Sequence, residues 1–162
     1  MIIRHANESD YVSVIHVIND WWGGRQMADM LPKLFFQHFQ TSSFIAEQDN
    51  EMIGFLVGFL SQTYPDEAYI HFVGVHPAYR RMGVARRLYE QFFSVAARHG
   101  RTTVRCITSP VNQTSIRFHT RMGFSIEPGD GEVDGIPYTS NYDGRGHDRV
   151  LFVKTLPPQE ED

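Results

Sequence analysis

The residues best suited to chemistry lie in one stretch, residues 68–88, with the sequence AYIHFVGVHPAYRRMGVARRL. It starts as an apolar, β-branched strand, breaks at Pro77, passes a basic turn around Gly83 and then opens an amphipathic helix. Such a junction directs several backbone N–H groups and the positive end of the helix dipole at one point. The pattern therefore predicts a pyrophosphate site, to which the neighbouring arginines add positive charge.

Other chemical signals in the sequence are weak. Residues 130–135 imitate the start of a calcium loop, but position twelve of that loop is Asn141 and not glutamate. The eight histidines form no HExxH motif and no close His/Cys cluster, and the single cysteine, Cys106, lies in an apolar strand pattern. We expect no metal site and interpret Cys106 as a small buried residue.

Composition limits the class of protein. A chain of 162 residues with 41% hydrophobic content can build one stable core, so we expect a single domain over residues 1–156 and a solvated tail over 157–162. A net charge of −4 argues against a nucleic-acid partner. The N-terminus has no apolar signal core, the longest apolar run (residues 52–60) is too short for a bilayer, and one cysteine fits a reducing compartment. We expect a cytoplasmic protein without a membrane partner.

The periodicity places elements around the predicted phosphate turn. Apolar alternation and turn residues indicate an antiparallel meander before the turn and a parallel crossover after it. In the second helix we expect Leu34, Phe35 and His38 to share one face, and a four-residue loop to join the second and third strands. A Gly-, Asp- and aromatic-rich loop of roughly 20 residues before the last strand is a candidate lid. The predicted strands are 2–4, 44–47, 52–60, 69–75, 103–107, 124–126 and 150–153. The predicted helices are 11–20, 31–39, 84–98 and 113–121, the first capped by Ser9-Asp10 and the last by Asn112.

Two motifs carry a resemblance to a known family. Residues 80–85, Arg-Arg-Met-Gly-Val-Ala, follow Val75-His76-Pro77 and resemble the acyl-CoA signature (Arg or Gln)-x-x-Gly-x-(Gly or Ala) of the GNAT superfamily of N-acetyltransferases. Residues 112–124 resemble the Asn-x-x-Ala-x-x-x-Tyr-x-x-x-Gly-Phe helix of the same superfamily, with Ser115 and His119 at the Ala and Tyr positions. The order of predicted elements matches from residue 2 to residue 153.

The resemblance implies a fold and a cosubstrate. The fold is an α/β protein with a central mixed sheet of six or seven strands, splayed in the middle, and helices on both faces. The donor is acetyl-CoA, whose pantetheine arm adds to the open edge of the central strand and whose carbonyl meets the Val75 N–H. The residues implied for its binding are Val73, Gly74, Val75, Arg80, Arg81, Met82, Gly83, Val84, Ala85, Arg86, Asn112, Ser115 and His119.

Two histidines are candidates for proton transfer. Strand alternation places Tyr69, His71, Val73 and Val75 on one face, and the strand is similar to that of arylalkylamine N-acetyltransferases, which carry histidines at the positions of Tyr69 and His71. His71 is our candidate base for the amine; a core histidine, with a water-mediated proton route, is the alternative. By the same resemblance His119 replaces the tyrosine that protonates the CoA thiolate, unless it is simply a surface histidine.

The acceptor site is predicted from aromatic residues outside the motifs. Trp21, Trp22, Phe35, Tyr69 and Tyr142 favour a small primary amine with an apolar or aromatic body, although a tryptophan pair is also typical of core packing. Asp143 would attract the charge of the amine. No nucleophile is placed to carry an acyl group, so we expect direct attack in a ternary complex. The alternatives are a non-catalytic acyl-CoA-binding module and a protein acetyltransferase acting on lysine or an N-terminus; a homodimer is left open.

Overall fold

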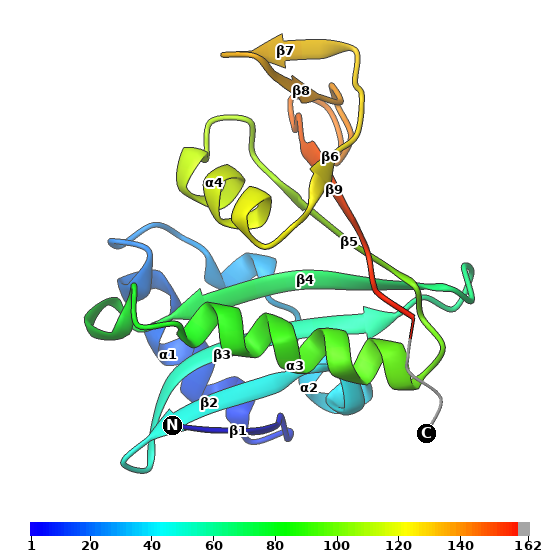
Figure 1. The fold of residues 1–162 in the computed structure, drawn as a ribbon. Coiled ribbons are helices and arrows are strands. Elements are labelled where there is room, and N and C mark those ends of the chain that lie inside the picture. The colour runs from blue at the N-terminus through cyan, green and yellow to red at the C-terminus, as the bar shows by residue number, and fades with distance from the viewer. Residues whose placement is uncertain (159–162) are drawn as a thin grey trace.

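The computed structural model describes residues 1–158 and is built on a seven-stranded mixed sheet (Figure 1). The predicted tail falls mostly outside the described residues. The first four strands form an antiparallel meander, and the last strand in sequence inserts between the fifth and the sixth. The strand order is β1 (Ile2–His5), β2 (Phe44–Gln48), β3 (Glu51–Leu60), β4 (Glu67–Val75), β5 (Thr103–Thr108), β9 (Val150–Thr155) and β6 (Ser125–Ile126).

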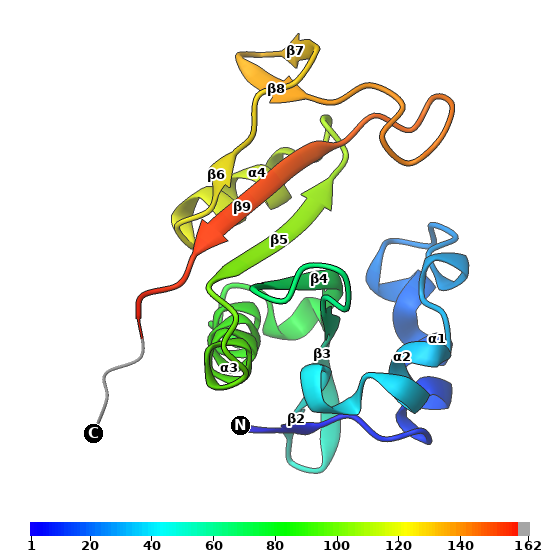
Figure 2. The ribbon, with the colours of Figure 1, turned by 90° about the vertical axis from the view of Figure 1, so that its right-hand side faces the viewer.

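Helices cover both faces of the sheet (Figure 2). One face carries α1 (Asp10–Trp21), α2 (Leu34–His38) and the short 3-10 helices η1 (Ala28–Met30) and η2 (Gln40–Ser42). The opposite face carries α3 (Val84–Arg98) and α4 (Gln113–Arg121), preceded in sequence by the short helix η3 (Pro77–Tyr79). Each face buries its own apolar cluster. The predicted fold class, a mixed sheet with helices on both faces, is confirmed.

The sheet opens between β4 and β5. These two strands run parallel but pair over only three positions, from Glu67 opposite Thr103 to Tyr69 opposite Arg105. Beyond Tyr69 they diverge, and β4 keeps its pairing with β3 alone up to Val75. The predicted parallel opening in the middle of the sheet is confirmed, and it leaves one edge of β4 free.

A β-bulge divides β4 into two halves, and the side-chain alternation of one half is shifted by one residue relative to the other. Val57 of β3 lies opposite Phe72 and Gly58 lies opposite Ile70, so His71 is the extra residue. A bulge shifts the side-chain alternation by one position. Ala68, Ile70, Val73 and Val75 accordingly pack on the α3 face, whereas Tyr69, His71 and Phe72 contact aromatic residues of the α1/α2 face. The expectation that Tyr69 and His71 share a face with Val73 and Val75 is wrong.

Two hairpin turns differ from the sequence prediction. The β2–β3 connection is a two-residue turn in which Asp49 and Asn50 both have positive φ, as in a type I′ turn. The long loop predicted before the last strand contains a hairpin, β7 (Gly131–Val133) and β8 (Ile136–Tyr138), around Asp134-Gly135. Both pairs allow the left-handed backbone that type I′ turns require, and Asp-Gly was the missed hairpin signal.

The second helix is shorter than predicted, and different residues face the core. It covers five residues, Leu34–His38, because η1 and η2 take up the flanking chain. Phe35 and Phe36 are buried, whereas Leu34 and His38 are exposed. The predicted face of Leu34, Phe35 and His38 is therefore wrong, and consecutive aromatic residues fill the core instead.

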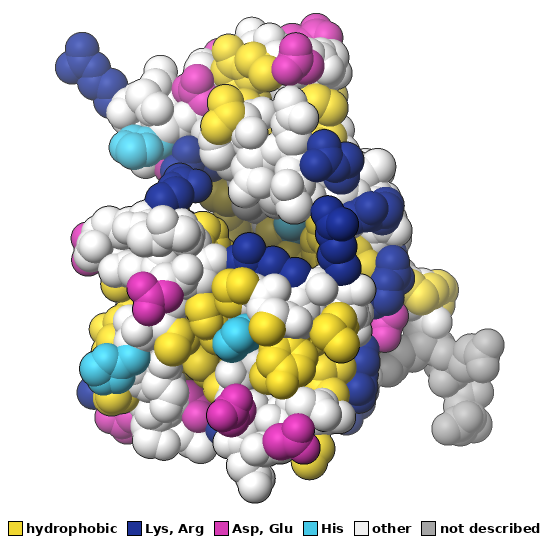
Figure 3. Space-filling view, turned by 90° about the vertical axis from the view of Figure 1, so that its left-hand side faces the viewer, with side chains coloured by type: hydrophobic (Ala, Val, Ile, Leu, Met, Phe, Trp, Pro, Cys, Tyr) yellow, Lys and Arg dark blue, Asp and Glu magenta, His cyan; other side chains and the backbone are white. Residues whose placement is uncertain are grey.

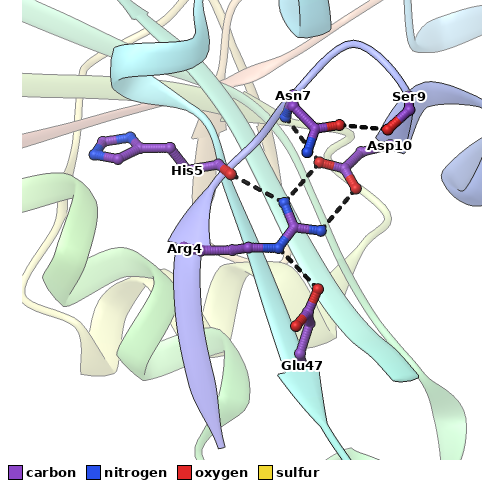
Figure 4. A network of polar contacts seen from close by, with 6 residues as sticks. All are labelled: Arg4, His5, Asn7, Ser9, Asp10 and Glu47. Atoms are coloured by element: carbon purple, nitrogen blue, oxygen red, sulfur yellow. Dashed lines mark hydrogen bonds and ion pairs between the residues drawn. The ribbon is translucent and has the colours of Figure 1, made fainter. Parts of the chain in front are cut away.

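A charged network fixes the start of α1 against the sheet (Figure 4). Arg4 of β1 donates two hydrogen bonds of 2.8 Å to Asp10 and one of 2.8 Å to Glu47 of β2. The Asp10 carboxylate also accepts the Asn7 N–H, whereas the Ser9 side chain makes no capping hydrogen bond, so of the predicted Ser9-Asp10 pair only Asp10 holds the start of the helix through its side chain. Burial alone raises the pKa of Asp10, but the bonds from Arg4 and Asn7 outweigh it and hold the pKa below its usual range.

Candidate active site

The turn before α3 has the form that an anion site needs. Gly83 has a φ of +79°, and a Cβ added there would meet no atom within 4 Å. The first helical hydrogen bond runs from the Arg87 N–H to the Gly83 carbonyl, so the N–H groups of residues 84–86 have no helical acceptor. Arg81, Met82 and Arg86 are exposed around them. Figure 3 shows this face hollowed in the middle and edged by Lys and Arg side chains.

The free edge of β4 leads to this turn. The His76 N–H donates to Ile53 of β3, so by strand alternation the N–H groups of Val75 and Val73 point to the opposite, unpaired edge. Gly74 lies between Val73 and Val75. On the α1/α2 face of the sheet, Phe55 and Trp22 fill the space that a side chain at Gly74 would need. The structure thus brings the predicted main-chain segment and the predicted phosphate turn together along one cleft.

Arg80 links the turn to α1. Its guanidinium donates to the backbone carbonyl of Trp21, the last residue of α1. The carbonyl end of a helix carries partial negative charge, which favours this contact. Arg80, Arg81 and Arg86 are all exposed, and Arg80 differs from the other two in its hydrogen bond to the end of α1.

His71 is exposed on the α1/α2 face and held in a defined orientation. Its Nε2 lies 2.8 Å from the Met30 carbonyl, and its ring stacks on Phe35 with centroids 4.7 Å apart and planes at 12°. A carbonyl only accepts hydrogen bonds, so Nε2 carries the proton and Nδ1 keeps a free lone pair in the neutral ring. The Met30 contact could not be found from the sequence, because it depends on how η1 meets β4.

Aromatic side chains surround His71. Phe35, Phe39, Phe59 and Tyr69 lie in successive contact, with ring centroids 5.2 to 5.7 Å apart for Phe35–Phe39, Phe39–Phe59 and Phe59–Tyr69. Phe39 and Phe59 were missed; their only signal was the helical spacing from Phe35 and the strand alternation of β3. This aromatic wall, defined as Phe35, Phe39, Phe59 and Tyr69, forms one side of the α1/α2 face.

The two tryptophans have different surroundings. Trp21 is 5% exposed and stacks on Phe55, so it belongs to the core. Trp22 is half-buried and packs on Phe72, with ring centroids 5.1 Å apart, next to Gly74. Of the two tryptophans predicted to bind the acceptor, only Trp22 is partly exposed, and it lies beside β4.

The loop before β9 approaches the same face. Figure 2 shows this loop on the same side of the sheet as α1 and α2. Burial raises the pKa of Tyr69, and Tyr142 of the loop adds to the effect. Asp143 is paired with Arg149 at 3.1 Å, so its charge is largely compensated. Tyr142 is 48% exposed. The structure thus brings Tyr69 and Tyr142 into one region but gives Asp143 a partner within its own loop.

His119 is part of the core. It is 6% exposed and stacks on Phe152, with Nε2 at 2.8 Å from the Tyr89 hydroxyl and Nδ1 at 2.7 Å from the Ser115 carbonyl. Both contacts are satisfied by a neutral ring in which Nδ1 donates and Nε2 accepts from Tyr89. Burial lowers the pKa of His119, and it raises the pKa of Tyr89. This environment favours a structural histidine over a proton donor to a thiolate.

The remaining motif residues on α4 serve the helix itself. The Asn112 side chain accepts the Ser115 N–H at 3.1 Å, which confirms the predicted N-cap. The Ser115 hydroxyl lies 3.2 Å from Nδ1 of His119. The side-chain N–H₂ group of Asn112 and the hydroxyl of Ser115 are the groups that could still bind a ligand.

Other features of the described residues lie away from this cleft. Two hollows of about 230 and 240 Å³ share Pro110 and Val133 and include none of residues 71–85. The first lies between α4 and the β7–β8 hairpin, and the second lies between this hairpin, the segment before α4 and the loop before β9. Within residues 1–158, no group of three or more His, Cys, Asp or Glu side chains could hold a metal ion. No helix in the same range is long and apolar enough to cross a bilayer.

The splayed sheet, the free edge of β4 and the glycine turn before α3 have the form expected of N-acyltransferases that use acyl-CoA. The model of the Acetyltransferase (GNAT) family matches residues 11–124, and the chain belongs to this family of acetyltransferases. An L-2,4-diaminobutyric acid acetyltransferase of Nocardia farcinica is 31% identical over 83 residues. That match covers 51% of this chain and 43% of the relative, so the chain spans under half the length of that protein.

Solved structures show the same fold. Ard1 from Thermoplasma volcanium superposes with a TM-score of 0.76 at 22% identity, covering 96% of this chain and 97% of that one. Diaminobutyrate acetyltransferase EctA from Paenibacillus lautus, solved with L-2,4-diaminobutyric acid and coenzyme A, gives a TM-score of 0.69 at 22% identity, covering 99% and 97%. Structures in this family thus hold coenzyme A in the fold found here.

Proposed function

We propose that this acetyltransferase transfers an acetyl group from acetyl-CoA to the primary amine of a small molecule by direct attack in a ternary complex. One observation carries the proposal: His71, with a free Nδ1, stands on the aromatic α1/α2 face beside the unpaired edge of β4. The partial similarity to a diaminobutyric acid acetyltransferase supports a small amine as acceptor.

The turn and strand suit acetyl-CoA as donor. Gly83 leaves room for close approach, the free N–H groups of residues 84–86 suit a diphosphate, and Arg81 and Arg86 supply charge. Residues Val73–Val75 offer main-chain groups along the free edge of β4. When bound, acetyl-CoA supplies an activated acetyl group. On this proposal the Val75 N–H stabilises the oxygen that becomes negative during transfer.

His71 removes the proton from the amine. An alkyl ammonium has a pKa of about 10.4, so a base is needed near neutral pH. Nδ1 of His71 accepts that proton while Nε2 stays bonded to the Met30 carbonyl, which fixes the ring. The partly exposed members of the aromatic wall, Phe39, Phe59 and Tyr69, hold the apolar body of the acceptor together with Trp22, with Tyr142 closing the site from the loop. Phe35 is buried and supports the His71 ring from the core. His119 has no acid role here, and the thiolate takes its proton from solvent.

Thiol release from acetyl-CoA tests this proposal. Wild-type protein is assayed with amines that include L-2,4-diaminobutyrate and arylalkylamines, and with peptides bearing free N-termini or lysines. We expect turnover with small amines. Among those that react, His71→Ala should lower kcat/KM about 10²- to 10⁴-fold at neutral pH and remove the acidic limb of the pH–rate profile.

Two results would contradict the assignment. A His71→Ala pH–rate profile identical to that of wild type removes His71 from the mechanism, and turnover with peptides alone replaces the small acceptor by a protein. His38→Ala is the matched control, because His38 is exposed on the outer side of α2 and has no proposed role.

A non-catalytic acyl-CoA-binding module is the second candidate. Its supporting observation is that His119, at the motif position of the usual tyrosine, is buried and engaged on both ring nitrogens. Calorimetric binding of acetyl-CoA without thiol release for any amine or peptide would favour this candidate.

A further inference from the structure

The phosphate turn is tied directly to the end of α1. Arg80 donates from its guanidinium to the Trp21 carbonyl, across 59 residues of sequence. A second contact lies beside it: the His76 ring meets the edge of the Trp21 ring, with centroids 5.6 Å apart. His76 also accepts the Ala78 N–H at 3.0 Å, which fixes the ring at the start of the turn. The turn and α1 are thus joined by a charged hydrogen bond and an aromatic contact.

The end of α1 is in turn tied to the segment that reaches His71. The Asn19 side chain accepts the N–H groups of Met27 and Ala28 at 2.8 and 3.0 Å, which closes residues 19–28 into one hydrogen-bonded loop. The next residues form η1, and the Met30 carbonyl at its end accepts from His71. A continuous set of contacts therefore runs from Arg80 through Trp21, Asn19 and Met30 to His71.

The guanidinium of Arg80 has enough donors to bond the Trp21 carbonyl and an anion at the turn at the same time. A guanidinium has five N–H donors in a rigid plane, and the Trp21 carbonyl uses one of its terminal nitrogens. The remaining donors stay available to an anion at the turn. Lysine has no such fixed fork, so Arg80 differs from a general positive charge beside a phosphate.

We infer that Arg80 is a positioning residue that couples binding of a CoA diphosphate at the turn to the ordering of residues 22–30 on the acceptor side. The inference rests on the proposed function only in assuming that CoA binds at the turn. It predicts that the donor orders Met30, and with it His71, before the acceptor arrives. Arg80 acts through the backbone of α1 and touches no acceptor.

Hydrogen exchange with coenzyme A as the ligand tests the inference without knowledge of the acceptor. In wild type, saturating CoA should slow exchange of the Met27 and Ala28 amides about fivefold or more. Arg80→Ala should bind CoA by calorimetry and lose this protection. Arg81→Ala removes the same charge from the same turn, and at saturation it should keep the protection. Both tryptophans of the chain lie at the junction, so their fluorescence gives a second readout that changes with CoA in wild type and Arg81→Ala.

A second variant covers the case in which Arg80→Ala binds CoA too weakly to saturate. Asn19→Ala leaves the turn intact but removes the acceptor of the Met27 and Ala28 amides, so by reciprocity CoA affinity should fall about fivefold, the same factor as the protection in wild type, and an unchanged affinity would overturn the coupling. Arg80→Lys should restore CoA affinity but not full protection.

The outcomes separate the two proposals. Wild-type protection in saturated Arg80→Ala, or loss of protection in Arg81→Ala equal to that in Arg80→Ala, overturns the coupling and leaves the proposed function intact. Failure of the wild type to bind CoA overturns the proposed function and the coupling with it.

Discussion

Replacing Gly58 by alanine tests whether the bulge at His71 is built into the core. Gly58 lies on β3 opposite Ile70, next to the extra residue of β4. Its N–H is bonded to the Ser43 hydroxyl at 3.3 Å and its carbonyl to the Ser42 hydroxyl at 2.7 Å. A Cβ at this position would lie 2.6 Å from the Tyr69 carbonyl oxygen and 2.7 Å from a ring carbon of the buried Phe92. The Tyr69 contact is with backbone, which cannot rotate away.

The expected cost follows from this overlap. Overpacking of a tight core site costs about 1–3 kcal/mol. A chain of this size loses about 2–4 °C of Tm per kcal/mol, which gives a fall of about 2–12 °C for Gly58→Ala. The displaced Tyr69 carbonyl lies two residues from His71, so kcat/KM for a reacting amine should also fall.

Thermal and urea unfolding followed by circular dichroism measure this change. Gly54→Ala is the matched control on the same strand, because a Cβ there would lie 3.0 Å from a methyl carbon of Val84 and 3.1 Å from the Gly74 carbonyl oxygen, contacts that are tight but less severe than the 2.6 and 2.7 Å at Gly58. We expect Gly54→Ala to cost less than Gly58→Ala. Equal stability of the two variants, or a Gly58→Ala protein as stable as wild type, would refute the argument that the bulge depends on Gly58.

Further predictions concern the charged network and the buried histidine. Arg4→Ala leaves the largely buried Asp10 carboxylate without its main partner, so the free energy of unfolding measured in urea should fall by about 1–3 kcal/mol. Lys33→Ala is the control: it removes an exposed ion pair of 3.7 Å and should change the free energy of unfolding by under about 0.5 kcal/mol. The folded-state pKa of Asp10 is lowered, so its stabilisation is present above about pH 4 and is lost as the pH falls through the folded-state pKa; the gap between wild type and Arg4→Ala should close there. The folded-state pKa of His119 is also lowered, so the unfolded chain binds its proton first and stability should fall as the pH drops below about 6.5. In Tm measurements from about pH 5 to 8, His119→Gln should reduce this slope; an unchanged slope would exclude His119 as its source.

The sequence alone determined most of the elements and the glycine turn before α3. Residues 68–88 encode a strand, a break and a helix start through local rules, because Pro77 stops the strand and Gly83 adopts a left-handed backbone at little cost. The Asn112 cap and the end of α3 at Gly100 follow from equally local chemistry. Alternation and helical spacing gave most of the strands and helices, whereas the splay of the sheet and the placing of helices on both its faces came from the resemblance to the GNAT superfamily.

The tertiary structure alone decided which side chains meet at the site. The bulge at His71 depends on how β4 pairs with β3, and one extra residue moves His71 to the face opposite Val73 and Val75. Arg80 reaches α1 and His119 becomes buried against Tyr89 because helices distant in sequence pack beside them. Periodicity reports the local backbone, whereas strand register and helix packing are set by partners 15 to 60 residues away, which no local pattern encodes.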